Sequence, residues 1–312
     1  MGTKPPGNPR PSRGGSALSS AGRETVSSAR ASTALKPVPH HERIEEPLFR
    51  RAVQLLDAGD EPGLRALLHQ HPHLIHQRVV FEGTSYFRNP SLLEFVAENP
   101  IRHGTLPPNI VAIAKVILEA GAELPAINET LGLVCSGRVP RECRIQLPLI
   151  HLLCHHGADP GKALHAALGH GEFEAAEALL LNGAALDLPA AAALGRTERF
   201  LRLLPLAASD DRHRALALAA QFGHIEIVKA LLDAGEDPNR YNPVGFHSHS
   251  TPLHQAALAG HDKLVRLLVE SGAQLDIKDV LWQGTPADWA AHASHTELEA
   301  WLRVQQDAKS RP

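Results

Sequence analysis

Aromatic residues are scarce in this sequence: Phe, Trp and Tyr together make up 4% of its 312 residues. Large globular cores usually depend on aromatic side chains, because each one buries a large apolar area. Hydrophobic residues still reach 43%, and many of them are Ala and Leu, which favour helices. The composition therefore predicts a folded chain of thin helical layers that pack through small residues.

Cysteine is also rare, and its three copies, Cys135, Cys143 and Cys154, form no CxxC pair. This predicts neither a disulfide framework nor a structural zinc site, and it favours a reducing compartment. The net charge of −3 provides no overall attraction to nucleic acid or to an anionic membrane, so we expect neither as a partner. A run of about 18 apolar residues and a secretory signal are both missing, which predicts a cytoplasmic protein without a membrane span.

The N-terminal residues have too little apolar surface to offset the entropy cost of folding. Six Lys and Arg residues face a single acid, Glu24, within the first 40 positions, which are rich in Gly, Pro and Ser. We expect a disordered basic tail over residues 1–42 and a short disordered C-terminal tail over 305–312. A basic tail also leaves open an alternative in which the protein is secreted into a host cell as an effector.

Internal repetition is the strongest feature of the remaining sequence. The stretches Arg214–Asn239 and Thr251–Asp276 align without a gap, and a third copy covers Thr285–Arg303. In the central copy Thr251 is suited to cap a helix that begins at Pro252. Glycines then end each of two short helices, because glycine readily adopts the left-handed conformation found at helix ends. Each copy is thus predicted to be a helical hairpin followed by an extended connector.

The stretch TPLHQAALAGHDKLVRLLVESGAQLD, Thr251–Asp276, resembles the ankyrin repeat through its TPLH, GH and GA motifs. The resemblance implies an all-α solenoid with short β-hairpin fingers, which we expect mainly at the C-terminal end. Gly183 and Gly235 each end a recognisable unit, and they lie 52 residues apart. This distance equals two units of 26 residues, so it predicts a hidden repeat between Leu188 and Asp210.

More divergent helix pairs are predicted nearer the N-terminus, and with them the solenoid should hold about eight repeats over residues 43–304. Repeats of 26 residues leave little chain for a finger, so the middle of the solenoid should lack fingers. The divergent segments are Leu48–Gly59, Pro62–Gln70, Ser91–Asn99 and Ile110–Glu119.

Histidine is unusually frequent, with 20 copies. The family resemblance implies that five of them form structural hydrogen bonds between turns and neighbouring repeats: His165, His224, His254, His261 and His295. Of the rest, His151 and His155 stand four residues apart, a spacing that suits two metal ligands, although no third ligand follows from the sequence. They are weak candidates for a metal site. The segment from His69 to His76 is better explained as a solvated turn around Pro72.

The resemblance favours a protein–protein interaction module whose partner is another protein or a peptide. Aromatic and Arg side chains dominate such interfaces, and the connectors offer both, although the longer connector could instead pack on its own repeat. The predicted partner-binding residues are Arg240, Tyr241, Phe246, His247 and His249 in one connector, Leu281 and Trp282 in the next, and Gln221, Phe222, Leu258 and His292 on the first helices of three repeats.

An enzyme or a metal protein that uses the surplus histidines remains the alternative. The sequence shows no Ser-His-Asp order, GxGxxG, Walker loop, HExxH or paired-carboxylate motif, so we expect neither catalysis nor a cofactor.

Overall fold

A computed structural model describes residues 41–82 and 86–309, which all belong to one compact unit. The predicted N-terminal tail therefore lies outside the described residues except for its last two positions. Those two residues, His41 and Glu42, belong to a short 3-10 helix, η3 (His41–Arg43). Every helix in the described part of the chain is too short or too polar to cross a membrane.

The described helices form eight successive pairs, and the two helices of each pair contact one another. The number of repeats predicted from the sequence is confirmed. The pairs are α1 (Pro47–Asp57) with α2 (Glu61–Gln70), η5 (Leu92–Ala97) with α3 (Ile110–Glu119), α4 (Leu124–Cys135) with α6 (Gln146–His155), α7 (Pro160–Gly169) with α8 (Phe173–Leu181), α9 (Leu188–Ala193) with α10 (Thr197–Leu203), α11 (Ser209–Phe222) with α12 (Ile225–Asp233), α13 (Pro252–Leu258) with α14 (Asp262–Glu270), and α15 (Pro286–His292) with α16 (Thr296–Lys309).

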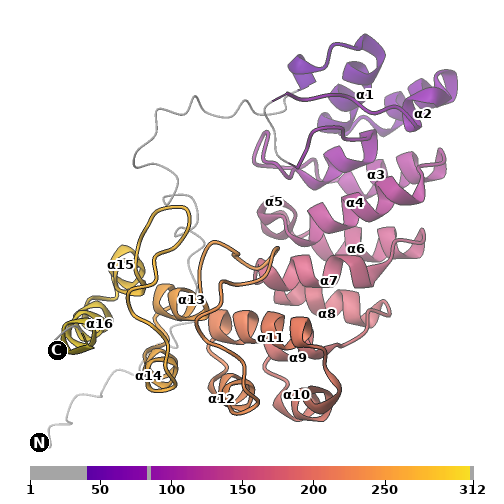
Figure 1. The fold of residues 1–312 in the computed structure, drawn as a ribbon. Helices are drawn as coiled ribbons and strands as arrows, with labels where there is room; N and C mark the ends of the chain where they lie inside the picture. Colours follow the sequence, from indigo (N-terminus) through magenta and orange to yellow (C-terminus); the bar gives the residue numbers. More distant parts are fainter. Residues whose placement is uncertain (1–40, 83–85, 310–312) are drawn as a thin grey trace, which may run out of the picture. The chain divides into compact units, whose positions relative to one another are not determined.

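The first helix of each pair contacts the first helix of the next pair without interruption from α1 to α15. Figure 1 shows this stacking in the order of the sequence. Short helices η4 (Pro72–Ile75), α5 (Arg138–Glu142) and η6 (Leu204–Leu206) lie in the connecting segments. The all-α solenoid predicted from the sequence is therefore confirmed.

The hidden repeat is formed by α9 and α10. The carboxylate of Asp187 caps α9 by accepting a hydrogen bond of 2.9 Å from the N–H of Ala190. The four alanines from Ala190 to Ala193 are completely buried, and their small side chains allow the close contact between α9 and α11. This repeat escapes easy recognition because alanine replaces the usual leucine stripe.

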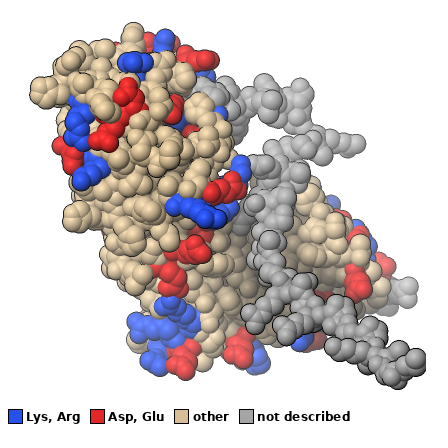
Figure 2. All heavy atoms as spheres, turned by 180° about the vertical axis from the view of Figure 1, so that it is seen from behind, with Lys and Arg blue, Asp and Glu red and all other residues tan. Residues whose placement is uncertain are grey.

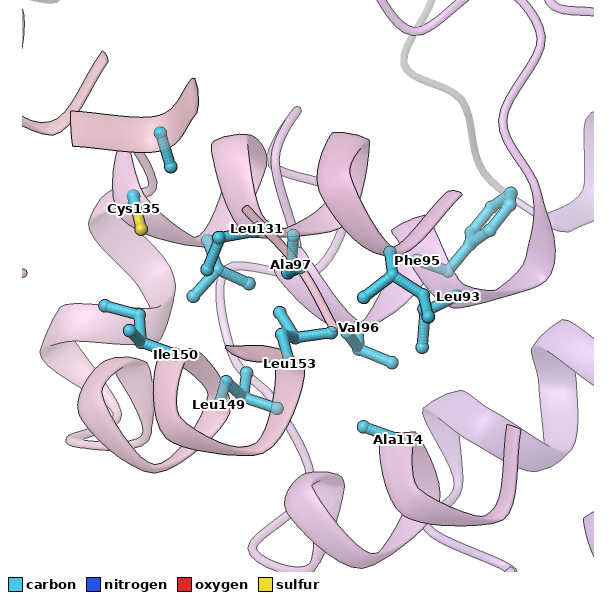
Figure 3. Close-up of a cluster of buried hydrophobic side chains, with 14 of the residues drawn as sticks. Leu93, Phe95, Val96, Ala97, Ala114, Leu131, Cys135, Leu149, Ile150 and Leu153 are labelled. Carbon is cyan, nitrogen blue, oxygen red and sulfur yellow. The ribbon is translucent and has the colours of Figure 1, made fainter. Parts of the chain in front are cut away.

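Two overlapping clusters of buried side chains hold the stack together, one extending from Ile44 to Phe246 and the other from Leu188 to Leu302. Figure 3 shows the part of the first cluster where η5, α3, α4 and α6 meet. The few aromatic residues are concentrated at its N-terminal end, where Phe95 lies 5.3 Å from Phe87 and 6.0 Å from Phe49 between ring centroids. Elsewhere aliphatic side chains and alanine fill most of the core, and Phe200 and Phe246 are the buried phenylalanines there.

Histidines of the GH motifs join neighbouring repeats, as the family resemblance implied. Each Nε2 atom bonds to a carbonyl near the end of the preceding repeat's first helix: His224 to Ala193 at 3.0 Å, His261 to Gln221 at 3.1 Å and His295 to Leu258 at 3.1 Å. Each imidazole also lies against the glycine of the preceding turn. A Cβ atom at Gly195, Gly223 or Gly260 would come within 2.6 to 2.8 Å of the ring.

The two histidines at the LH positions also have structural partners. His254 accepts a hydrogen bond of 3.2 Å from the N–H of Thr251, so its other nitrogen donates to the carbonyl of Gly284 at 3.2 Å. His165 lies 2.8 Å from the carboxylate of Asp187. The predicted structural role is confirmed for all five histidines.

The expectation of β-hairpin fingers is not confirmed. Within the described residues the connectors contain no strand, and the one isolated β-bridge joins Arg78 to Ser91. A single bond from the N–H of Asn242 to Ser250 closes the long connector, but the N–H of Ser250 bonds back to His247, so no ladder can continue.

The predicted C-terminal boundary is too early. Helix α16 continues to Lys309 rather than ending at residue 304, because Gln305, Gln306 and Ala308 are compatible with a helix and no Gly or Pro interrupts them. Only residues 310–312 of the predicted tail lie outside the described residues.

Candidate functional site

The two C-terminal connectors form one surface. We call Arg240–Ser250 the first connector and Asp279–Gly284 the second connector. The N–H of Val280 donates a 2.8 Å hydrogen bond to the carbonyl of His249, and the hydroxyl of Tyr241 donates one of 2.7 Å to the carbonyl of Lys278, the residue directly before the second connector. The sequence indicated two separate fingers, whereas the structure joins them at two points.

The carboxylate of Asp279 organises the second connector. This side chain is fully buried and accepts four hydrogen bonds: from the N–H groups of Leu281, Trp282 and Gly284 at 2.9, 2.7 and 2.8 Å, and from the indole of Trp289 at 3.0 Å. Burial by itself would raise the pKa of Asp279, but the hydrogen bonds outweigh it and hold the pKa below its usual value. The ionised carboxylate therefore fixes the turn.

Three apolar side chains in a row are exposed by this turn: Val280 at 59%, Leu281 at 62% and Trp282 at 47%. Tyr241 of the first connector is 42% exposed. We call these four residues the connector patch. One side of the Trp282 indole contacts His249 edge to face, with 5.1 Å between ring centroids, so the indole is supported while much of it faces solvent.

A pocket of about 390 Å³ is lined in part by the first connector. Nδ1 of His213 and both side-chain amide atoms of Asn242 are buried and form no hydrogen bond in the structure. Since Nε2 of His213 donates to the carbonyl of Tyr241 at 2.9 Å, its Nδ1 is an acceptor. The lining residues are Asp210, His213, Arg214, Arg240, Tyr241, Asn242, Pro243 and Val244.

Phe246 is not the exposed aromatic anchor that the sequence suggested. Its side chain is only 6% exposed, and its ring packs against His165 with 6.1 Å between ring centroids. Gly169, at the end of α7, lies beside the same ring, since a Cβ atom there would stand 3.9 Å from Phe246, an ordinary van der Waals distance. The first connector thus packs partly on its own solenoid.

The other predicted residues of the first connector lie closer to solvent. Arg240 is exposed and forms no ion pair with another described residue. His247 adopts a left-handed conformation, with φ of 61°, and its ring centroid lies 6.0 Å from that of His249. His247 and His249 remain predicted partner contacts at the edge of the connector patch.

The predicted first-helix residues are spread over three repeats. The amide of Gln221 donates to the carbonyl of Gly169 at 3.3 Å, and Phe222 packs edge-on against Phe173 with 4.9 Å between ring centroids. Leu258 is half-buried, and His292 is exposed at the end of α15. Their role in partner binding stays a prediction.

The weak metal candidates His151 and His155 do not gather a third ligand. Both are exposed, and Nδ1 of His151 lies 3.0 Å from the side-chain amide of Asn182. Across residues 41–82 and 86–309, one group of three ligating side chains is close enough to share an ion, and it consists of His41, Asp57 and His103.

Sequence reasoning missed the roles of Asp279, Asn242 and His213. For Asp279 a signal exists, because an aspartate followed within five residues by glycine is typical of a turn in which the side chain bonds to later backbone N–H groups. The unpaired atoms of Asn242 and His213 have no such signal, since burial depends on distant segments.

Charged residues show no large basic region on the face in Figure 2, where Lys and Arg side chains are interspersed with Asp and Glu. Several form exposed ion pairs, such as Arg196 with Glu177 at 2.6 Å and Arg266 with Asp262 at 2.9 Å. The absence of a nucleic-acid partner and the cytoplasmic location remain predictions of the sequence.

Comparison with known proteins finds one matching family model, described as ankyrin repeats in three copies. It matches residues 143–242, 188–279 and 216–309, which together span more than half of the chain.

Individual relatives match shorter parts of the chain. Cyclin-dependent kinase inhibitor 2A of Monodelphis domestica is 33% identical over 126 residues, which are 39% of this chain and 71% of the relative. Cyclin-dependent kinase 4 inhibitor B of Bos taurus is 30% identical over 39% of this chain and 93% of its own length. Rabankyrin-5 of Homo sapiens is 34% identical over 41% of this chain but only 10% of its own length.

Proposed function

Because the chain belongs to the ankyrin-repeat family, whose repeated helices serve protein–protein interaction, we propose that it binds another protein or a peptide through the connector patch. The partner would place an apolar side chain against Leu281 and Trp282 and approach the pocket beside Tyr241.

The main observation behind this proposal is that the buried carboxylate of Asp279 holds a turn whose apolar side chains are exposed. The four hydrogen bonds to Asp279 fix a turn whose outer residues, Val280, Leu281 and Trp282, are about half or more exposed. Consecutive exposed apolar residues on a protein surface usually mark an interaction site. A turn that is already ordered also loses little conformational entropy on binding.

Polar recognition would come from the pocket. The exposed side chain of Arg240 belongs to the lining of this pocket. Arg240, which forms no ion pair with another described residue, suits a carboxylate on the partner. This side chain favours a polypeptide with an acidic residue next to its apolar anchor.

The names of two relatives state that they inhibit cyclin-dependent kinases. These names support a protein as the class of partner. The connector patch contains no feature specific to a kinase, so the proposal does not extend to one.

Affinity capture with single-residue variants tests the proposal. Trp282→Ala is expected to weaken capture of the main partner from the native source by about 30-fold, since a central aromatic anchor contributes about 2 kcal/mol or more. Leu206→Ala is the matched control, because Leu206 is 87% exposed on η6 and belongs to neither connector. Equal partner recovery with both variants, at unchanged helical circular dichroism, would contradict the proposal.

A further inference from the structure

Three segments that are distant in the sequence bring possible metal ligands together at the first helix pair. His41 lies in η3, Asp57 is the last residue of α1, and His103 follows η5. Oδ2 of Asp57 is 3.2 Å from Nε2 of His103 and 3.7 Å from Nδ1 of His41. All three ligand atoms lie within 4.8 Å of one another.

We propose that His41, Asp57 and His103 bind a zinc-class divalent cation. Zn²⁺ takes imidazole nitrogen and carboxylate oxygen at about 2.0 to 2.1 Å in tetrahedral geometry, which places neighbouring ligand atoms about 3.3 to 3.4 Å apart. The two separations from Asp57, 3.2 and 3.7 Å, lie on either side of this value. A small movement of His41 would complete three ligands, and water would take the fourth position.

The imidazole of His41 supplies independent support. Its Nδ1 atom is buried and has no hydrogen-bond partner in the structure, although it faces the carboxylate of Asp57. A buried nitrogen without a partner loses its hydration and gains nothing in return. Coordination to a cation shared with Asp57 would satisfy it.

The loop that carries His103 is built around a second buried carboxylate. Glu98 is 1% exposed and accepts hydrogen bonds from the N–H groups of Arg102 at 2.7 Å and Gly104 at 3.0 Å, and also from that of His103. The backbone on both sides of the histidine is therefore fixed. A metal site needs such preorganisation, because the ligands must hold their geometry.

Arg102 orients Asp57 from the opposite side. Its guanidinium donates two hydrogen bonds, of 2.9 and 2.8 Å, to the two oxygens of Asp57 and lies 3.0 Å from Glu98. Carboxylates that ligate metals are commonly held by such hydrogen bonds. The two carboxylates of Asp57 and Glu98 outnumber the single guanidinium of Arg102, so the cluster has a net negative charge when both histidines are neutral. It therefore still attracts a cation.

Bound metal would join η3 and the loop after η5 to the end of α1. The inference does not depend on the proposed partner binding, because the connector patch lies in the sixth to eighth helix pairs and shares no residue with these ligands. The expected role is structural, since the ligands close the first repeat rather than line a pocket.

Metal titration of the full chain tests this inference. Protein prepared without a polyhistidine tag is stripped with EDTA and titrated with ZnCl₂ by calorimetry, and with CoCl₂ to record the absorption of a tetrahedral ion. We expect one Zn²⁺ per chain. His41→Gln and His103→Gln should each weaken binding by at least about tenfold, because even supporting residues around a metal change its affinity by about 10- to 100-fold.

The double variant H151Q/H155Q is the matched control, because it removes two exposed histidines that share a helix and should leave zinc affinity unchanged. Zinc should also raise the melting temperature of the wild type and the control, but not that of the two ligand variants. If one ligand variant loses its helical circular dichroism, the zinc affinity of the other variant is used to test the inference. A wild type that binds no more zinc than H41Q/H103Q, or a control that loses as much affinity, would overturn the inference.

Discussion

The indole of Trp289 donates a hydrogen bond of 3.0 Å to the carboxylate of Asp279, which lies ten residues earlier in the chain. Trp289 belongs to α15 and Asp279 to the second connector, so the bond ties the exposed turn to the final helix pair. Trp289 is only 8% exposed, so its side chain belongs to the core of the final repeat. It also holds the connector patch in place.

Asp279→Asn should destabilise the protein by about 2 kcal/mol, because an amide nitrogen cannot accept hydrogen bonds and at least one buried N–H group would lose its partner. Urea denaturation followed by circular dichroism measures this change. Asp276→Asn is the control, since Asp276 is exposed and its replacement should change the free energy of unfolding by less than about 0.5 kcal/mol. Equal stability of the two variants would show that Asp279 does not organise the turn.

Two glycines separate the effect of backbone strain from that of contact with a histidine ring. Gly260 and Gly272 have positive φ angles of 71° and 94°, but a Cβ atom at Gly260 would lie 2.6 Å from His295, whereas nothing lies within 4 Å of one at Gly272. Both alanine variants should lose about 1 to 3 kcal/mol from strain. Gly260→Ala should lose more, and the difference should shrink when His295 is also replaced by Ala. A difference that persists without the imidazole would contradict this explanation.

Acid should destabilise the protein through its buried histidines. Burial is the largest effect on His261 and lowers its pKa below the ordinary value of 6.5, despite the hydrogen bond with Gln221. The unfolded state therefore binds more protons below pH 6.5, and the free energy of unfolding should fall as the pH drops from about 7 to 5.

His261→Gln should make this decrease smaller, which urea denaturation at several pH values will measure. Glu94 acts in the opposite direction, because burial raises its pKa to about 7 and the folded state keeps its proton where the unfolded state loses it. Comparison of the variant with the wild type cancels the contribution of Glu94. An identical pH dependence in both proteins would exclude the assigned role of His261.

The three cysteines should differ in reactivity. Cys135 is completely buried, and burial raises the pKa of its thiol, so little thiolate is available near neutral pH. Cys143 and Cys154 are partly exposed. Labelling with iodoacetamide under native conditions, followed by peptide mass spectrometry, should modify Cys143 and Cys154 well before Cys135. Labelling of Cys135 at the same rate would place that thiol outside the core.

Local patterns explain why much of the fold could be predicted. The Thr251-Pro252 start, the GH motif and the glycine that ends each second helix recur at fixed offsets, and each fixes a nearby hydrogen bond or backbone angle. The hidden repeat also followed from spacing alone, although its alanine-rich helix resembles no strong motif. Phe246 was misplaced because its burial depends on packing against distant residues such as His165, which lies 81 residues earlier in the chain.

The candidate sites were harder to predict because they join segments through long-range contacts. Tyr241 and Trp282 were identified as exposed aromatics, but both bonds that join their connectors end on backbone carbonyls of distant residues, and such acceptors carry no signal in the sequence. The ligand group of His41, Asp57 and His103 brings together three different segments. Spacing favoured His151 and His155 instead, because a four-residue separation on one helix is visible and a tertiary cluster is not.

Site-specific photo-crosslinking tests the central claim most directly. A photoreactive phenylalanine analogue is placed at position 282, or at position 206 as a control, and the protein is irradiated with extract from its native source. We predict a crosslinked partner polypeptide at position 282 that is missing at position 206, and that decreases when an excess of unlabelled wild-type protein competes. Crosslinks at position 206 alone, or no effect of the competitor, would contradict binding through the connector patch.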